Sequence, residues 1–143
     1  MEEFRSISIQ WQCQQLINRV TNLLDQGRWE ELAQCYTEDA VLFRPSDPNH
    51  GVEGRDAILQ SFADRPSRTT CHLLGNTFFD VQSEHRVVAT SRVWLISGPD
   101  SATHPVLAEQ KILAGSFIDT LVNTGGQWLI QLRRGSIELK YGD

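Results

Sequence analysis

A histidine and an asparagine share one face of a predicted strand in the middle of the chain. In the segment from Thr69 to Thr77, strand alternation sends His72, Asn76 and the following Phe78 to the same side. An imidazole and an amide among aliphatic and aromatic neighbours predict a ligand pocket, because a desolvated imidazole needs a partner or a catalytic task. The same pattern also fits a core or interface histidine that bonds to the backbone.

The remaining histidines and the glycines give no sign of a metal or cofactor site. His50, His85 and His104 lie in turn-like segments, and none has a second histidine or an acid at metal-ligand spacing. Gly51 and Gly54 precede a predicted helix, but they do not form a nucleotide-binding pattern. We expect neither a metal nor a cofactor.

Composition narrows the class of protein. The chain has 143 residues, a formal charge of −5 and only two lysines, and its arginines are scattered, so a nucleic-acid partner is not expected. Its length fits one domain that spans residues 1–143. There is no membrane-spanning apolar stretch and no basic-then-apolar start, which predicts a cytoplasmic protein that does not bind membranes. Cys13, Cys35 and Cys71 are expected to be free thiols.

Periodicity divides the chain into helices followed by strands. Helical spacing of apolar residues predicts helices over 8–25, 29–36 and about 55–64, and a short strand over 40–43 leads into a loop rich in proline. Beyond residue 70 the period changes to that of strands. Four extended runs joined by turn-like segments cover 71–82, 86–97, 106–122 and 127–139.

This order of elements predicts an α+β domain in which three N-terminal helices pack on a curved antiparallel sheet. The run 86–97 is apolar on both sides, with Val87 and Val93 on one face and Trp94 and Ile96 on the other. Because both faces of that strand need covering, we expect a homodimer that forms through the outer face of the sheet.

A family resemblance rests on five segments of the chain, residues 24–32, 36–43, 51–58, 115–119 and 126–133. These segments resemble SnoaL-like proteins of the nuclear-transport-factor-two-like superfamily. The resemblance implies a cone-shaped α+β barrel around one apolar pocket, commonly in a dimer. That superfamily includes dehydratases, isomerases, cyclases, hydrolases, binding proteins and the small subunits of ring-hydroxylating dioxygenases, so the fold leaves the chemistry open.

Within the superfamily, the local pattern is most similar to scytalone dehydratase. That resemblance assigns a helix carboxylate to Asp25, four residues before Trp29, and a strand histidine to His72, before Gly75 and Thr77. It implies that Asp25 orients His72 as an acid and base. The dehydratase's second histidine would fall in residues 113–115, which hold none, and its tyrosines fall on Leu24 and near residues 43–44. A solvated carboxylate at a helix end is the alternative interpretation of Asp25.

Two functions follow as hypotheses. The first is a cofactor-independent dehydratase or isomerase with His72 and Asp25 as catalytic residues, acting on a small, largely apolar carbonyl or hydroxyl compound, aromatic or polycyclic. The second is a noncatalytic small-molecule-binding protein or a scaffold subunit like the dioxygenase small subunits. The residues expected to contact the ligand are Asn76, Phe43, Phe62, Phe78 and Arg44. Asp119 and Arg133 are expected to form a cross-strand ion pair.

Overall fold

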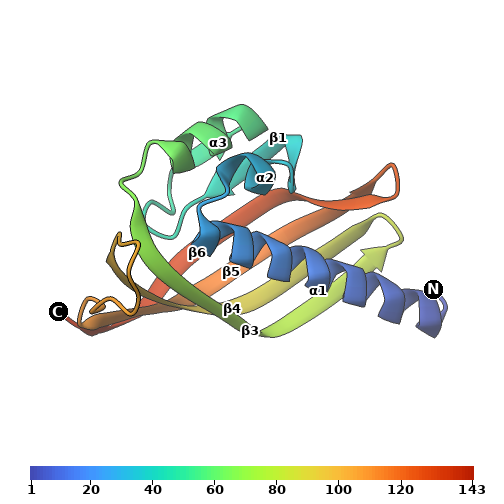
Figure 1. The fold of residues 1–143 in the computed structure, drawn as a ribbon. Helices are drawn as coiled ribbons and strands as arrows, with labels where there is room; N and C mark the ends of the chain where they lie inside the picture. Colours follow the sequence, from blue (N-terminus) through green and yellow to red (C-terminus); the bar gives the residue numbers. More distant parts are fainter.

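The computed structural model describes residues 1–143 as three helices and one six-stranded sheet (Figure 1). The helices are α1 (Glu3–Gln26), α2 (Trp29–Ala33) and α3 (Arg55–Ala63). The strands are β1 (Tyr36–Phe43), β2 (Gly51–Glu53), β3 (Arg68–Ser83), β4 (Arg86–Pro99), β5 (Lys111–Thr124) and β6 (Gln127–Gly142). No helix is long and apolar enough to cross a membrane.

The sheet has the strand order β2-β1-β6-β5-β4-β3. Strands β3 to β6 form the predicted antiparallel meander, so the α+β class is confirmed. The first strand differs from the prediction, because β1 starts at Tyr36, inside the segment expected to be helical, and pairs in parallel with β6. That parallel partner is remote in sequence, and a window of local periodicity does not detect it.

Two further boundaries correct the sequence prediction. Strand β2 forms within the segment expected to be a loop, where Leu42 pairs with Val52 in a short antiparallel ladder. Residues 106–110 were expected to be extended, but they precede β5 because no neighbouring strand pairs with them. Both errors concern pairing rather than local composition.

Helix α1 crosses the concave face of the sheet and ends beside β3 (Figure 1). Its buried stripe is Ile9, Cys13, Leu16, Ile17, Val20 and Leu23. The helix stops at Gly27, which adopts a left-handed φ of 67° and donates its N–H to the carbonyl of Leu24. This end fixes the position of Asp25, one residue before the last residue of the helix.

The outer face of the sheet carries exposed apolar side chains. Leu73 and Trp94 are paired neighbours on β3 and β4, and both are exposed, as is Ile118 on β5. On the opposite face of β4, Val87 and Ala89 are fully buried under α1 and belong to the core. The alternation predicted for this strand is therefore present. All three cysteines are free, and Cys71 is exposed.

Candidate functional site

One cavity of about 460 Å³ lies between the helices and the concave face of the sheet. Its inner wall includes the buried side chains of Tyr36, Leu42, Phe62 and Phe117. Nine of its 26 lining residues are hydrophobic, so the cavity is more polar than the apolar pocket that the sequence predicted. A ligand there meets an apolar wall and several polar or charged groups.

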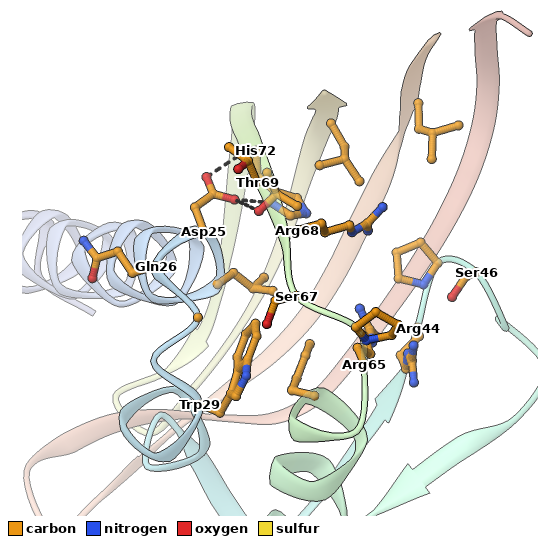
Figure 2. Close-up of a pocket in the computed structure, with 18 of the residues that line it drawn as sticks. Asp25, Gln26, Trp29, Arg44, Ser46, Arg65, Ser67, Arg68, Thr69 and His72 are labelled. Atoms are coloured by element: carbon orange, nitrogen blue, oxygen red, sulfur yellow. Dashed lines mark hydrogen bonds and ion pairs between the residues drawn. The ribbon is translucent and has the colours of Figure 1, made fainter. Parts of the chain in front are cut away.

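Asp25 and His72 meet at one end of this cavity (Figure 2). The Asp25 Oδ1 atom lies 2.6 Å from His72 Nδ1, and the two side chains are 23% and 13% exposed. The Thr70 hydroxyl donates to Oδ1 at 2.9 Å, and the His72 backbone N–H donates to Oδ2 at 2.9 Å. Three hydrogen bonds from β3 therefore fix the carboxylate.

The local structure explains why these groups face each other. Gly27 ends α1 two residues after Asp25, which leaves the carboxylate at the end of the helix beside β3. Thr70 and His72 are two residues apart on β3, so both side chains point toward the same face. With Nδ1 bonded to a carboxylate, a neutral imidazole carries its proton on Nδ1 and keeps the Nε2 lone pair free.

A buried arginine lies deeper in the cavity. Arg133 donates to the two oxygens of Asp119 at 2.8 and 3.0 Å, and both side chains are almost fully buried. Its guanidinium stacks over Phe117 at 4.0 Å and also interacts with Tyr36. Although burial opposes the charge, Asp119 and Tyr36 hold the pKa of Arg133 above its usual value. The expected cross-strand pair is present, and it is a buried one.

Tyr36 supplies a hydroxyl in the same part of the cavity. Burial raises the pKa of Tyr36 to about 12, with the charge of Arg133 acting in the opposite direction. The side chain is therefore a neutral phenol over the whole physiological pH range, and it can donate a hydrogen bond to a ligand oxygen.

Two of the expected ligand contacts lie outside the cavity. Asn76 is exposed with a left-handed φ of 51°, and Phe78 is 69% exposed. The cause is a β-bulge, because the pairing of β3 with β4 shifts register between Gly75 and Phe78. A bulge breaks strict alternation, so His72 and Asn76 do not share the wall that their spacing predicts.

The other expected contacts divide between two locations. Phe62 and Arg44 line the cavity, and Phe62 stacks on Trp29 at a centroid distance of 5.3 Å. Phe43 does not line it and instead lies under the guanidinium of Arg134 at 4.3 Å. Phe43 and Arg44 alternate along the end of β1, so only one of them reaches the cavity.

Several lining residues were not anticipated from the sequence. Tyr36 was expected in a helix, and His104 in a turn without a metal-binding role, and both line the cavity. Arg65, in the connection between α3 and β3, and Arg68, the first residue of β3, also line it. The sequence places Arg65 and Arg68 close together, on either side of Pro66 and Ser67. That spacing alone did not predict that both side chains line one cavity.

In this α+β fold, three N-terminal helices pack on a curved, mostly antiparallel sheet and enclose a cavity. This is the architecture of the nuclear-transport-factor-two-like superfamily. A family model described as a SnoaL-like domain matches residues 5–134, and the chain therefore belongs to the SnoaL-like family. No curated protein sequence matches this chain.

Solved structures with a similar fold cover almost the whole chain. A protein from Novosphingobium aromaticivorans, assigned as a scytalone dehydratase, is 25% identical, has a TM-score of 0.83, and aligns over 98% of this chain and 91% of its own. A hexachlorocyclohexane dehydrochlorinase, LinA type 2, is 14% identical, with a TM-score of 0.81 and coverage of 98% and 92%. The second likeness shows the fold alone.

Proposed function

We propose that this protein is a cofactor-independent dehydratase or isomerase that acts on a small carbonyl or hydroxyl compound. The observation that carries the proposal is the 2.6 Å contact between Asp25 and His72 at the wall of a cavity large enough for such a ligand. An imidazole held by a carboxylate, with its second nitrogen free, has the arrangement of a general base.

In the proposed dehydration, His72 Nε2 takes the proton from the carbon next to the substrate carbonyl. The electrons of that C–H bond form the enolate and then the new C=C bond, as the C–O bond to the leaving hydroxyl breaks. The imidazolium returns its proton to that hydroxyl, which departs as water. In the isomerase variant, the proton returns to a different carbon of the same molecule. Asp25 stabilises the imidazolium in both cases.

The developing negative charge on the carbonyl oxygen needs a donor. Tyr36 on β1 and Arg133 on β6 line the same cavity, and the buried pair with Asp119 holds the guanidinium of Arg133 in place. A neutral phenol supported by a guanidinium can donate a hydrogen bond to an enolate oxygen, which typically lowers the barrier by a few kcal/mol, about 3 kcal/mol in known oxyanion sites.

The names of the similar structures support the proposal. The 25% identical protein is assigned as a scytalone dehydratase, and LinA is a dehydrochlorinase, so both names describe the removal of a leaving group and a proton from adjacent atoms. The same chemistry suits a base that needs no cofactor. The missing histidine in residues 113–115 distinguishes this chain from the dehydratase pattern and makes His72 the single proposed base.

The proposal is tested with a phenyl-substituted β-hydroxy ketone, whose dehydration gives a conjugated enone with strong ultraviolet absorbance. Wild-type protein should release the enone, and His72→Ala should lower turnover on the order of a hundredfold or more with an unchanged melting temperature. His85→Ala is the matched control, because His85 is an exposed histidine that does not line the cavity.

Equal turnover by wild type and His72→Ala would overturn the catalytic role. Binding of the ketone without enone release or deuterium exchange next to the carbonyl would favour the noncatalytic binding protein. The two outcomes are separated by measuring binding and turnover on the same samples.

We also propose a homodimer that covers the apolar outer face formed by Leu73, Trp94 and Ile118. Exposed apolar patches of this kind typically mark protein contacts. Sedimentation should give a dimer at micromolar concentration, and Trp94→Glu should give a monomer. The three free thiols fit a reducing compartment, and we place the protein in the cytoplasm.

A further inference from the structure

Three arginines line the cavity, of which Arg44 and Arg65 lie away from Asp25 and His72 and Arg68 lies nearer to them (Figure 2). Arg44 follows the last residue of β1, Arg65 lies in the connection after α3, and Arg68 is the first residue of β3. Figure 2 shows Arg44 and Arg65 next to each other, apart from the hydrogen-bonded Asp25–His72 pair. Two segments that are separate in sequence, the end of β1 and the connection from α3 into β3, therefore bring positive charge to the cavity wall.

These arginines have no carboxylate partners. The seven ion pairs of the protein include none of the three. The acids nearby are engaged elsewhere, since Asp64 accepts from Gln60 and Asp47 contacts His50. Asp100 also lines the cavity, but it is exposed and forms no ion pair with the three arginines.

Two of the guanidinium groups contain buried atoms without hydrogen-bond partners. The Nε atoms of Arg44 and Arg65 are the only buried side-chain nitrogen or oxygen atoms of the protein in this state. Buried donors are normally satisfied, and an unpartnered one in a native fold calls for a functional explanation. Both atoms belong to residues that line the cavity, where a ligand can reach the guanidinium groups.

The charges also disfavour one another. Burial, followed by the charges of Arg44 and Arg68, lowers the pKa of Arg65 to about 10. Arg65 is still charged at neutral pH, and its guanidinium stacks on the ring of Phe62 at 4.8 Å, which fixes its position at the edge of the apolar wall. A negative charge placed among the three arginines would remove the repulsion and satisfy the free donors.

We propose that Arg44, Arg65 and Arg68 form a subsite for an oxyanion of the substrate, either a carboxylate or a phosphate. Guanidinium groups suit both anions, because their N–H donors lie in a planar fork that matches two oxygens. The inference rests on the proposed function for the substrate's reaction, but the subsite itself requires only binding. It assigns the substrate an acidic group at one end and its reacting carbon near His72 at the other.

The subsite narrows the substrate class that the sequence predicted. The nine hydrophobic lining residues receive the apolar body of the ligand, while the arginines receive its charged end. The expected substrate is therefore a small acid with an apolar body, rather than a wholly apolar compound. A net charge of −5 makes a local cluster of unpaired cations in the cavity more selective, since the rest of the surface repels anions.

The test measures binding by calorimetry with hydrocinnamate and with its neutral isostere hydrocinnamamide. Wild-type protein should bind the carboxylate about tenfold more tightly than the amide, as expected for one or two charge-assisted hydrogen bonds. The preference should fall as salt is raised. Phenyl phosphate, compared with phenol, provides the phosphate arm, and a preference for either anion over its neutral partner supports the subsite.

The variants Arg44→Gln, Arg65→Gln and the double variant should lose the preference for the anion, with binding of the amide unchanged. Arg134→Gln is the matched control, because Arg134 is an exposed arginine that has no carboxylate partner and does not line the cavity. Circular dichroism checks the fold of each variant. The salt dependence uses wild-type protein alone, so it decides the question even where a variant fails to fold.

Equal affinity of wild type for the acid and the amide would overturn the subsite, as would an unchanged preference in the double variant. Failure of the proposed reaction gives a different result. His72→Ala should keep the preference for the anion while it loses turnover. A wild-type protein that turns over the neutral ketone but binds the acid and the amide equally would reject the subsite alone.

Discussion

The two ends of the cavity differ in how their charged groups are satisfied. At the end formed by α1 and β3, Asp25 accepts three hydrogen bonds, and His72 has one defined partner. At the other end, Arg44 and Arg65 leave donors unpaired. The hydrogen-bonded pair of Asp25 and His72 is held in a fixed geometry, as a catalytic step requires. The unpaired donors of Arg44 and Arg65 can be satisfied by an anionic ligand. The two proposals accordingly place the reaction at one end of the cavity and recognition of the anion at the other.

The largest expected effect concerns Arg133, the cavity arginine that does have a partner. Asp119→Ala leaves a fully buried guanidinium without its carboxylate, and loss of one member of a buried pair costs about 3–5 kcal/mol of unfolding free energy. Chemical denaturation measures this change. A loss of unfolding free energy below about 1 kcal/mol is the size found for exposed ion pairs. Such a result would show that Arg133 does not depend on its carboxylate partner, and it would contradict the contrast with Arg44 and Arg65.

A smaller effect is expected at the hydrogen-bonded end. Asp25→Asn keeps the size of the side chain but removes the charge that stabilises the imidazolium, so turnover should fall about tenfold or more. Affinity for hydrocinnamate should stay the same, because the anion binds at the other end. Steady-state kinetics and calorimetry measure the two quantities, and a variant that loses affinity but keeps turnover would reverse the assignment of the two ends.

The smallest effect is expected for the stability of Arg65→Gln. The wild-type charge is disfavoured by burial and by its arginine neighbours, so its removal should leave the unfolding free energy within about 0.5 kcal/mol of wild type, or raise it. Thermal and chemical denaturation provide the measurement. A clear fall in the unfolding free energy would indicate that Arg65 stabilises the fold, which would contradict a role in ligand binding alone.

Much of the fold could be predicted from the sequence. The apolar stripe of α1 and the turn segments between β3, β4, β5 and β6 are local signals, and the structure follows them. The parallel pairing of β1 with β6 depends on residues about 90 positions apart, such as Leu42 and Arg133, and no local pattern reports it. The short strand β2 forms only because it pairs with β1.

The site was harder to predict than the fold. Asp25 and His72 came from a family-like spacing, and the structure brings them together. Asn76 and Phe78 were placed by strict alternation, which the bulge after Gly75 interrupts. The arginine group was not anticipated, because Arg44 comes from a different segment than Arg65 and Arg68, and only the folded chain brings the three to one cavity.

The central claim is that Asp25 holds His72 with a free Nε2 atom, and the tautomer of His72 tests it most directly. Two-bond proton–nitrogen correlation spectra distinguish the ring nitrogen that carries the proton from the one that does not. Neutral His72 should carry its proton on Nδ1 and leave Nε2 unprotonated, and Asp25→Ala should lose this preference. A neutral His72 with its proton on Nε2 in the wild-type protein would contradict the proposed role of His72, since that atom could not accept a proton.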